Sequence, residues 1–462
     1  MAAHDFDLIV VGAGPGGYVS AIRAAQLGLK TAVVEKDKPG GVCGNWGCIP
    51  SKALINQAEG FERIKDLEAI GVKVDTSNFN YAAVQKKSRD AADRSGKGVQ
   101  FLLKKNKIEY IQGTAVLNGP QSLLVDGKEY KARFILLAAG SRPRQLPGFE
   151  FDENQVLSST GILSLTQLPK SLIILGSGAI GMEFAYVMSV FGVKVTVVEM
   201  LPRILPLEDH ETSAVVEKAF KARGVSFFTS AKATELKKNS QGVSLTLQLA
   251  DNKTQILEAE KILVAVGRVP NTENLGLEKV GIKTDRGFVV VTDYYQTDVP
   301  SIYAIGDLIP SPLLAHVASK EGEIAVEHMA GKAHEKRVDP LSIPAATYCE
   351  PQIASFGYTE EKLKEKGLAY KAYTFPYTGN GKANAIEHQE GLVKVLMDAK
   401  THEILGGHAA GAYATEIIHE ILLARKAELL PEDIATMVHA HPTISESVME
   451  AARGLEGWAI HI

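Results

Sequence analysis

Apolar runs that end in glycine recur along the chain and predict parallel β-strands. The stretch "FDLIVVGAGPGGYVSAIRAAQLGLKTAVVEK", residues 6–36, contains an apolar run, a glycine-rich turn, a helical stretch and a second apolar run that ends in an acid. The stretch "SLIILGSGAIGMEFAYVMSVFGVKVTVVEM", residues 171–200, repeats this order. Short apolar runs that alternate with helical stretches are typical of βαβ units with parallel strands. The pattern therefore predicts two such units.

Later apolar runs complete this picture and then depart from it. "ARFILLAAGSRPR" (132–144) and "KILVAVGRVPNT" (261–272) predict buried parallel strands that close with glycine, and "VPSIYAIGDL" (299–308) ends a strand on a glycine and an aspartate. From about residue 342 the pattern of apolar and polar residues changes, as in "ATYCEPQIASFGYTEEKLKEKG" and the alternating stretch "GLVKVLMDA". These features indicate an antiparallel sheet with helices, and hence a separate domain.

Length and charge narrow the class of protein. The 462 residues are 45% apolar and 23% charged, with a formal net charge of −4, which suggests three globular domains. No block of like charges points to nucleic acid or anionic lipid, and no apolar run approaches the roughly 20 residues that cross a bilayer. The first residues lack the pattern of a secretory signal. We therefore expect a cytosolic chain, or an organellar one after removal of a transit peptide.

Both βαβ stretches carry a G-x-G-x-x-G pattern followed by an acid. The residues are Gly12, Gly14, Gly17 and Glu35 in the first and Gly176, Gly178, Gly181 and Glu199 in the second, with equal spacing from first glycine to acid (35 − 12 = 199 − 176 = 23). Such glycines admit a pyrophosphate and the acid accepts from ribose hydroxyls, so two dinucleotide sites are expected. Glu199 favours NAD over NADP because it repels a 2′-phosphate. Two alternatives remain. Arg203, four residues later, is a cation that would weaken the preference for NAD, or Glu199 is simply a solvated strand end.

The chain has only three cysteines, of which Cys349 stands alone, while Cys43 and Cys48 lie together in "GGVCGNWGCIPSKALI" (40–55). A metal clip would need a second pair of ligands, and a secreted disulfide scaffold would need more cysteines. In an ideal helix, residues five apart are too distant for a disulfide, but Gly44 and Gly47 can distort the turn. A redox-active pair is favoured.

The segment "HAHPTISE" (439–446) offers a general base. His441 is followed five positions later by Glu446, and a histidine with a carboxylate is the usual arrangement for proton transfer at a reacting thiol. The alternatives are a simple His-Pro turn or a metal site that includes His439. The metal alternative lacks a third ligand nearby.

Taken in order, "GAGPGGY", "GGVCGNWGCIPSKAL", "GSGAIGMEFA", "VGRVPNT", "YAIGDL", "LAHVASKEG" and "HAHPTISE" resemble the FAD-dependent pyridine nucleotide-disulfide oxidoreductases from end to end. The most similar branch oxidises protein-bound dihydrolipoamide. Two positions depart from the family pattern, because Trp46 stands where an aliphatic residue is usual and "AAG" at 138–140 replaces Ala-Thr-Gly. Neither departure removes a reactive group.

The resemblance implies an α/β fold with two Rossmann-like dinucleotide-binding domains and a C-terminal α+β dimerisation domain. It implies an FAD-binding domain over 1–144 and 269–341, an NAD-binding domain over 145–268 and an interface domain over 342–462. The first fingerprint would bind FAD and the second NAD. The residues assigned to FAD are Gly12, Gly14, Gly17, Glu35, Lys52, Gly140, Asp307 and Ala315, and those assigned to NAD are Gly176, Gly178, Gly181, Glu199 and Gly267.

The resemblance also implies the chemistry. Cys48 would face the flavin and Cys43 would exchange with the substrate dithiol, while Lys52 would lie near flavin N5 and pair with Glu183. The base pair His441–Glu446 would come from the other subunit of a homodimer, and the lipoyl group from a partner protein of a 2-oxo acid dehydrogenase or glycine cleavage complex. A glutathione-type reductase and a non-catalytic flavin redox sensor are the alternatives. Mercuric reductase is disfavoured because no cysteine pair lies near the C-terminus.

Overall fold

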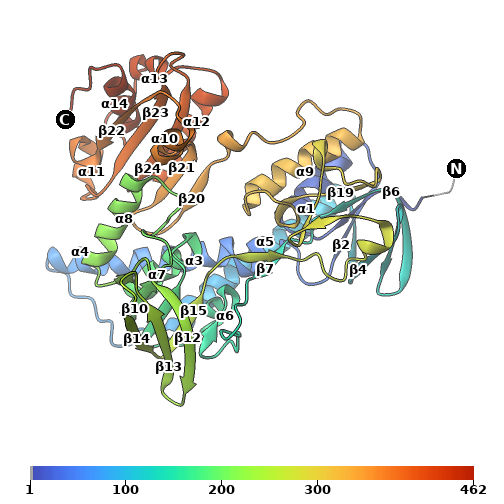
Figure 1. The fold of residues 1–462 in the computed structure, drawn as a ribbon, viewed down its shortest axis with the longest axis horizontal. Helices are drawn as coiled ribbons and strands as arrows, with labels where there is room; N and C mark the ends of the chain where they lie inside the picture. The colour runs from blue at the N-terminus through green and yellow to red at the C-terminus, as the bar shows by residue number, and fades with distance from the viewer. Residues whose placement is uncertain (1–3) are drawn as a thin grey trace. The chain divides into compact units, whose positions relative to one another are not determined.

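The structure is a computed structural model that describes residues 4–462 (Figure 1). It divides into two compact units. The first contains the described residues up to Leu54, together with 82–144 and 267–338. The second contains residues 55–81, 145–266 and 339–462. Each unit is therefore assembled from segments that are distant in the sequence.

The first unit is built on a mainly parallel sheet. Its parallel strands run in the order β3-β2-β1-β6, with β19 on the other side of β6, and an antiparallel hairpin of β4 and β5 continues from β6. The strands are β1 (Phe6–Val11), β2 (Thr31–Glu35), β3 (Glu109–Gln112), β4 (Ala115–Gly119), β5 (Ser122–Val125), β6 (Lys128–Leu137) and β19 (Ile302–Ala304). Strands β1 and β2 are almost wholly buried, as expected for a sheet that is covered on both faces.

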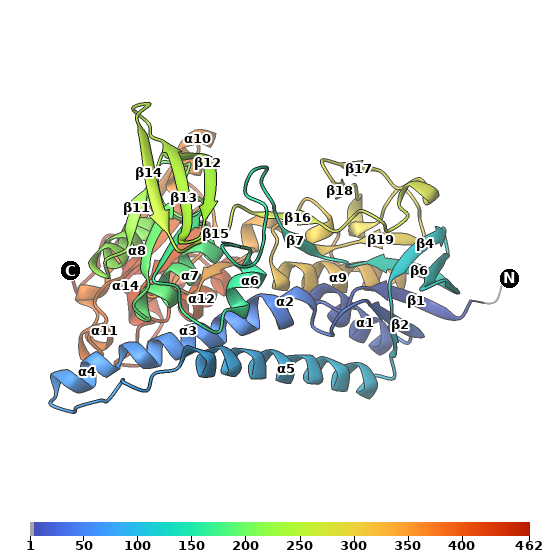
Figure 2. The ribbon, with the colours of Figure 1, turned by 90° about the horizontal axis from the view of Figure 1, so that it is seen from below.

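Helices pack against this sheet. Helix α1 (Pro15–Gln26) lies beside α9 (Ala315–Met329), and the long helix α5 (Tyr81–Lys105) runs past the sheet (Figure 2). Two strand pairs, β7 (Ser141–Pro143) with β16 (Arg268–Pro270) and β17 (Thr284–Asp285) with β18 (Phe288–Val289), complete the unit. The first pair joins the segments that follow two of the predicted glycine-ended strands.

The second unit contains a second parallel sheet, in the order β11-β10-β9-β15-β8. Its strands are β8 (Val156–Leu157), β9 (Ser171–Leu175), β10 (Lys194–Val198), β11 (Ser226–Phe228) and β15 (Lys261–Val264), and its helices are α6 (Ser159–Ser164), α7 (Ala179–Val190) and α8 (His210–Ala222). A three-stranded antiparallel meander of β12 (Lys232–Asn239), β13 (Gly242–Gln248) and β14 (Thr254–Ala259) accompanies it. The two predicted βαβ units are thus confirmed, one in each unit.

The C-terminal part of the second unit is an antiparallel sheet, as its sequence predicts (Figure 1). The strand order is β20 (Ala345–Thr347), β21 (Ile353–Gly357), β24 (Ile404–Ala410), β23 (Leu392–Asp398) and β22 (Tyr370–Pro376), with helices α10 (Glu360–Lys366), α11 (Gly381–Ala385), α12 (Ala414–Lys426), α13 (Pro431–Thr436) and α14 (Glu446–Leu455). Strand β23 does not alternate in burial, however, because six of its seven residues are buried. Both faces of this strand are therefore covered, although its alternating sequence is typical of a strand with one solvent-exposed face.

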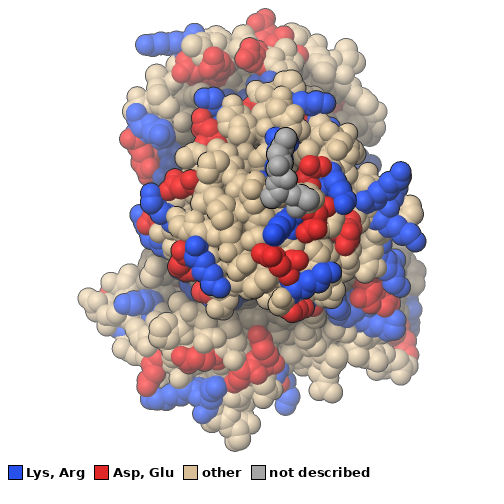
Figure 3. Space-filling view, turned by 90° about the vertical axis from the view of Figure 1, so that its right-hand side faces the viewer, with Lys and Arg blue, Asp and Glu red and all other residues tan. Residues whose placement is uncertain are grey.

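Surface features add little to this picture. On the face shown in Figure 3, lysine and arginine side chains are interspersed with aspartate and glutamate. Among residues 4–462, no helix is both long enough and apolar enough to cross a membrane.

Candidate functional site

The first glycine loop joins β1 to α1. Gly12 has φ +106°, a conformation that L side chains rarely adopt, and a Cβ at this position would collide with the carbonyl oxygen of Ala138. A Cβ at Gly17 would meet the carbonyl oxygen of Gly12. Gly14 is the N-cap of α1 and makes no side-chain capping bond. Glu35, at the end of β2, accepts hydrogen bonds from the backbone N–H of Ala13 at 2.7 Å and from that of Asp37 at 2.8 Å.

The second glycine loop repeats this geometry between β9 and α7. Gly176 has φ +102°, and a Cβ there would approach the carbonyl oxygen of Ala265 to 2.6 Å. Gly178 is the uncapped N-cap of α7, and a Cβ at Gly181 would meet the carbonyl oxygen of Gly176. Glu199 accepts from the N–H of Ser177 at 2.9 Å and from that of Leu201 at 2.8 Å. The same spacing in the sequence therefore produces the same hydrogen bonds.

Both loops fit a dinucleotide. The first N–H groups of α1 and α7 have no side-chain cap, so they are available to an anion such as a pyrophosphate. The nearest heavy atom to a Cβ built on Gly14 is 3.9 Å away, and around Gly178 there is none within 4 Å. A Cβ at Gly178 would therefore meet open space, whereas a Cβ at Gly14 would be in ordinary contact with Gly41, and the carboxylate beside each loop can accept from a ribose.

The two cysteines lie on either side of a break in the helix. Cys43 belongs to α2 (Gly41–Trp46) and Cys48 begins α3 (Cys48–Glu62), while Gly47 between them has φ −149° and ψ −113°. The distortion is therefore at Gly47, and Gly44 lies inside α2. Both cysteines are thiols in this structure, and both are partly exposed. Cys349 is fully buried, which leaves the close pair as the accessible one.

The two thiols interact directly. A hydrogen bond with Cys48 and burial raise the pKa of the Cys43 thiol, and the charge of Lys52 acts in the opposite direction. Cys43 therefore holds its proton more strongly than an isolated cysteine. Lys52 lies on α3, four residues after Cys48.

Trp46, one of the departures from the family pattern, is held by side chains of the same unit. Its indole Nε1–H donates to a carboxylate oxygen of Asp37 at 3.3 Å, and the guanidinium of Arg89 lies 4.9 Å from the ring centroid. Arg89 also donates to the carbonyl oxygen of Asn45 at 2.8 Å. Arg89 thus steadies the turn that carries both cysteines, a role that sequence reasoning missed because α5 is distant along the chain.

Asp307 and Arg268 form a second cluster in the first unit. Ser141 Oγ donates to Asp307, and Arg268 donates to Ser141 through Nε at 2.7 Å and through Nη2 to its carbonyl oxygen at 2.8 Å. Burial lowers the pKa of Arg268, whereas the charges of Asp307 and Cys48 work to raise it. Sequence reasoning singled out Gly267 but missed Arg268 beside it, which brings a cation to the dithiol and to Asp307.

The turns around Asp307 are tied together by backbone contacts. Gly140, with φ +67°, accepts through its carbonyl oxygen from the N–H of Asn271 at 2.9 Å, and the carbonyl oxygen of Gly267 accepts from the N–H of Arg144 at 3.0 Å. Ala315 is the first residue of α9, whose N-cap makes no side-chain capping bond. The start of this 15-residue helix is therefore uncapped by a side chain as well, and its N–H dipoles favour a negative charge.

Glu321 is a further residue that sequence reasoning missed. It lies on α9 inside "LAHVASKEG", is 1% exposed, and accepts from the N–H of Gly306 at 2.7 Å. Burial raises its pKa to about 7, against the lowering effect of that hydrogen bond. The signal that could have found it is an acid on the apolar face of a helix.

The expected partners Lys52 and Glu183 belong to different units, Lys52 to the first and Glu183 to the second. Glu183 lies on α7, is buried, and accepts from the N–H of Tyr348 at 3.1 Å. The structure thus gives Glu183 a defined orientation within its own unit. Its pairing with Lys52 remains a prediction.

His441 and Glu446 are brought together in the second unit. Nδ1 of His441 lies 2.9 Å from a carboxylate oxygen of Glu446, and the other oxygen accepts from the N–H of Thr443 at 2.8 Å. Burial works to raise the pKa of Glu446, but these hydrogen bonds and the imidazole outweigh it and leave the pKa lowered. His439 pairs instead with Glu420 at 2.7 Å, so each histidine has its own carboxylate.

Comparison with protein families decides the class. Residues 6–322 match the family described as pyridine nucleotide-disulphide oxidoreductase, and residues 343–452 match its dimerisation domain. The chain belongs to the pyridine nucleotide-disulphide oxidoreductase family. It is therefore an oxidoreductase whose cofactors are FAD and NAD, and its dimerisation domain supports a homodimer.

Members of the family resemble the chain over its full length. The dihydrolipoyl dehydrogenase of Rhizobium etli is 43% identical, covering 97% of this chain and 98% of the relative, and that of Zymomonas mobilis is 43% identical over 100% of both. Among solved structures, LpdA from Mycobacterium tuberculosis has a TM-score of 0.89 at 29% identity, covering 97% of this chain and 99% of the other. The flavoprotein disulfide reductase RclA from Escherichia coli has a TM-score of 0.86 at 25% identity, with the same coverage.

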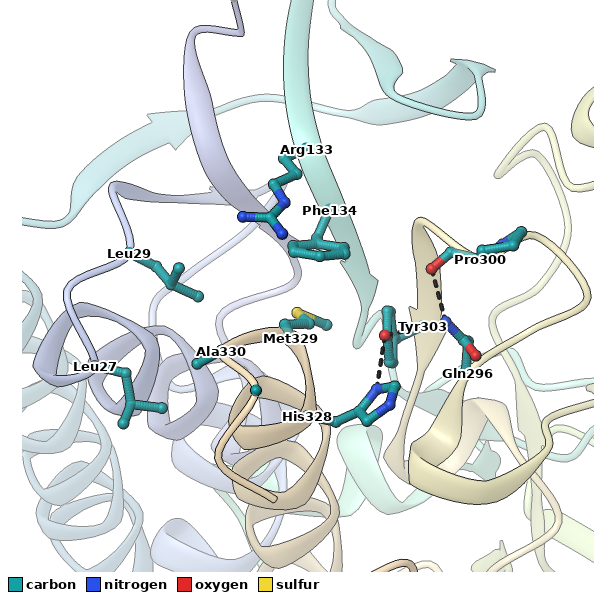
Figure 4. A pocket seen from close by; sticks show the side chains of 11 residues that line it. Leu27, Leu29, Arg133, Phe134, Gln296, Pro300, Tyr303, His328, Met329 and Ala330 are labelled. Carbon is teal, nitrogen blue, oxygen red and sulfur yellow. Dashed lines mark hydrogen bonds between the residues drawn. The ribbon is translucent and has the colours of Figure 1, made fainter.

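The first unit also contains a pocket of about 550 Å³, whose lining residues differ from those described above (Figure 4). Its lining includes Leu29, Arg133, Phe134, Tyr303 and His328, with Nδ1 of His328 2.9 Å from the Tyr303 hydroxyl. Leu29 precedes β2, and Phe134 lies opposite Leu8 near the start of β1. The pocket thus lies near the amino ends of parallel strands, whereas the family's nucleotide site lies at the carboxyl ends.

Proposed function

We propose that the chain oxidises protein-bound dihydrolipoamide to lipoamide and passes the electrons to NAD⁺, giving NADH. The observation that carries this proposal is the contact between the Cys43 and Cys48 thiols across the break at Gly47. A thiol pair at this position, in a family member that is 42–44% identical to proteins named dihydrolipoyl dehydrogenase, supports exchange with a small dithiol.

The two glycine loops would hold the cofactors. The loop at Gly12, Gly14 and Gly17 with Glu35 would bind FAD, and the loop at Gly176, Gly178 and Gly181 with Glu199 would bind NAD. Asp307, Ala315, Gly140 and Lys52 would complete the FAD site, and Gly267 the NAD site. The uncapped helix starts at both loops and the open space at Gly178 support this assignment. FAD, when bound, supplies the two-electron relay between the thiol pair and NAD⁺.

The dithiol exchange transfers two electrons from the substrate to the cysteine pair. In the oxidised enzyme a thiolate of dihydrolipoamide attacks Sγ of Cys43, forming a mixed disulfide and releasing Cys48 as a thiolate. The second substrate thiol then attacks its neighbouring sulfur, which forms lipoamide and releases Cys43. The enzyme gains two electrons, and NAD⁺ finally takes a hydride while one proton leaves to solvent.

The electrostatics support the roles of the two cysteines. Because the hydrogen bond with Cys48 keeps the proton on Cys43, the first negative charge of the reduced pair is expected on Cys48. Arg268 and Lys52 are cations that favour such a charge. We infer that Glu183 pairs with Lys52 and orients its ammonium.

His441 would be the general base for the substrate dithiol, with Glu446 as its orienting carboxylate. The 2.9 Å contact at Nδ1 leaves Nε2 as the nitrogen that can accept a proton. His441 is well exposed in this single chain, with 75% of its side chain accessible, which suits a residue that acts at a neighbouring subunit. We therefore propose that the base reaches the dithiol of the partner subunit in a homodimer.

The remaining assignments concern the whole protein. We propose FAD-binding segments over 1–144 and 269–341, an NAD-binding domain over 145–268 and an interface domain over 342–462. The lipoyl group would come from a protein of a 2-oxo acid dehydrogenase or glycine cleavage complex. A reducing compartment, the cytosol or an organellar matrix, suits a pair of working thiols.

The test is a comparison of steady-state rates with dihydrolipoamide and NAD⁺ against those with glutathione disulfide and NADPH. We expect kcat/KM for the first pair to exceed the second by at least about 10²-fold, because the dithiol and Glu199 both select against the second pair. The variant Cys48→Ser should retain FAD, seen by its absorbance, and lose dihydrolipoamide turnover.

Two results would overturn the proposal. Faster turnover of glutathione disulfide with NADPH would assign the chain to the glutathione-type alternative. Bound flavin with no turnover of either pair would favour the redox-sensor alternative.

A further inference from the structure

The loop that follows Glu199 carries a cation whose position bears on nucleotide choice. Glu199 directly follows the last residue of β10. Arg203 lies four residues later, before α8 begins at His210. The carboxylate of Glu199 is fixed by Ser177, which donates through both its N–H and its hydroxyl. A guanidinium this close in sequence to the ribose-binding acid would offer a 2′-phosphate a charge-assisted partner.

Arg203 is engaged elsewhere in the structure. Its Nη1 forms an ion pair with Glu361 at 3.1 Å, and its Nη2 donates to the carbonyl oxygen of Glu208 at 2.9 Å. Glu361 lies on α10, in the C-terminal part of the chain and far from Arg203 in sequence. Both side chains are only partly exposed, at 29% for Arg203 and 36% for Glu361. The guanidinium therefore already has its anionic partner.

Helix α10 is itself firmly anchored to the end of the same loop. Its first residue, Glu360, lies 2.6 Å from Nζ of Lys394, and the same ammonium lies 3.0 Å from Asp209. Lys394 is 1% exposed, and Asp209 caps α8 by accepting from the N–H of Glu211. Because a buried ammonium must keep its carboxylate partners, this pairing holds α10 against the loop and fixes the place of Glu361.

We propose that Glu361 is a specificity-determining residue for the nicotinamide nucleotide. By binding Arg203 it withholds the guanidinium from the 2′ position of the nucleotide and leaves that position to the carboxylate of Glu199. The proposal rests on the proposed role of Glu199 as the residue that reads the ribose. In this arrangement the preference for NAD is set partly by a side chain of the C-terminal sheet region, outside the βαβ unit that carries the fingerprint.

The experiment measures binding rather than turnover. NAD⁺ and NADP⁺ are titrated calorimetrically into the FAD-loaded enzyme without a dithiol substrate. We expect Glu361→Gln to lower the Kd for NADP⁺ about ten-fold, because a freed guanidinium can form charge-assisted hydrogen bonds with the 2′-phosphate. The Kd for NAD⁺ should change less than about two-fold, since it offers only a hydroxyl.

Matched variants separate this role from a structural one. Glu365→Gln, on the same helix and paired with Lys362 at the surface, should leave both Kd values unchanged. Arg203→Met should not tighten NADP⁺ binding, and adding it to Glu361→Gln should abolish the gain. Thermal melting and flavin absorbance establish that each variant is folded.

The proposal is overturned if folded Glu361→Gln keeps the wild-type ratio of the two Kd values, or if the gain persists in the double variant. It is also overturned if Arg203→Met alone weakens NAD⁺ binding ten-fold, since Arg203 would then bind NAD itself. These readouts do not depend on the dithiol, so a failure of the dihydrolipoamide assay is distinguishable from a failure here.

Discussion

Individual carboxylates perform different work in this chain according to their surroundings. Glu35 and Glu199 accept from backbone N–H groups and stand at the mouths of glycine loops, where a charged acid is useful. Glu321 is sealed inside the first unit, and burial raises its pKa to about 7. The charged form of Glu321 therefore destabilises the folded state, although all three residues have the same side chain.

The replacement Glu321→Gln should reveal this cost as a change in pH dependence. The folded-state pKa of about 7 lies above the ordinary value, so the native state binds the proton more strongly, and the contribution of Glu321 to the stability of the wild type should fall as pH rises from about 4.5 to 7. Glutamine can still accept from Gly306 and does not titrate. We expect Glu321→Gln to gain up to about 3 kcal/mol over wild type by pH 8, relative to pH 4.5.

The measurement is chemical denaturation of both proteins across this pH range. Glu323→Gln, a half-buried position on the same helix, is the control and should follow the wild type. Parallel pH curves for wild type and Glu321→Gln would contradict the assignment.

At the scale of elements, two local devices build the site. Each strand–glycine–helix unit places a helix start directly over a strand end, and the tight contact of Gly17 with Gly12 sets how closely α1 approaches β1. The second device is the break at Gly47, which separates α2 from α3. Both depend on glycines with no room for a side chain, because a Cβ at Gly17 would collide with the carbonyl oxygen of Gly12 and a Cβ at Gly47 would lie 3.1 Å from that of Val42.

We expect Gly17→Ala to damage both stability and flavin binding. Its Cβ would collide with the carbonyl oxygen of Gly12, so α1 must move away from the loop. Overpacking of this kind costs about 1–3 kcal/mol. Urea denaturation and flavin absorbance after desalting measure the two effects.

Gly98→Ala is the matched control for that variant. Gly98 lies inside α5, with no heavy atom within 4 Å of a built Cβ, so alanine should stabilise the chain by about 0.5–1 kcal/mol. If Gly17→Ala retained wild-type stability and flavin content, the close contact would not be a requirement for the site.

At the scale of the whole molecule, the candidate chemistry is divided between the two units. Cys43 and Cys48 belong to the first unit, and His441 and Glu446 belong to the second. The second unit also carries the dimerisation domain of the family. The proposed cross-subunit site therefore makes a prediction about mixed dimers.

Dimers that combine one Cys48→Ser subunit with one His441→Gln subunit should recover activity. Each variant alone should lose dihydrolipoamide oxidation, His441→Gln by roughly 10²–10⁴-fold, the range for a positioned acid–base group. The heterodimer would contain one site with both a complete dithiol and an intact base. Steady-state rates of dimers whose subunit exchange has been verified by two affinity tags provide the measurement.

A second measurement distinguishes the role of His441 as base from the function of the flavin. NADH oxidation by an artificial acceptor that takes electrons from the flavin should survive in His441→Gln, because it bypasses the dithiol. Loss of both activities together would contradict the role as base. Failure of exchanged heterodimers to exceed either parent would contradict the cross-subunit arrangement.

Much of this protein is determined by local sequence. The two glycine fingerprints with their acids, the cysteine pair and the His441–Glu446 spacing each act within a few residues or one βαβ unit, where backbone geometry and chain connectivity leave little choice. For this reason the fold class and the family could be predicted from the amino-acid sequence alone. The alternatives for Arg203 could not be separated in the same way.

The tertiary structure decided the contacts between distant segments. It buried Lys394 beside Asp209 and Glu360, and it gave Arg203 its partner Glu361. It also brought Arg268 within electrostatic reach of Cys48. Charged residues that are distant in the sequence pair only after the chain has closed long loops. The energies of these ion pairs depend on burial, which no local pattern specifies.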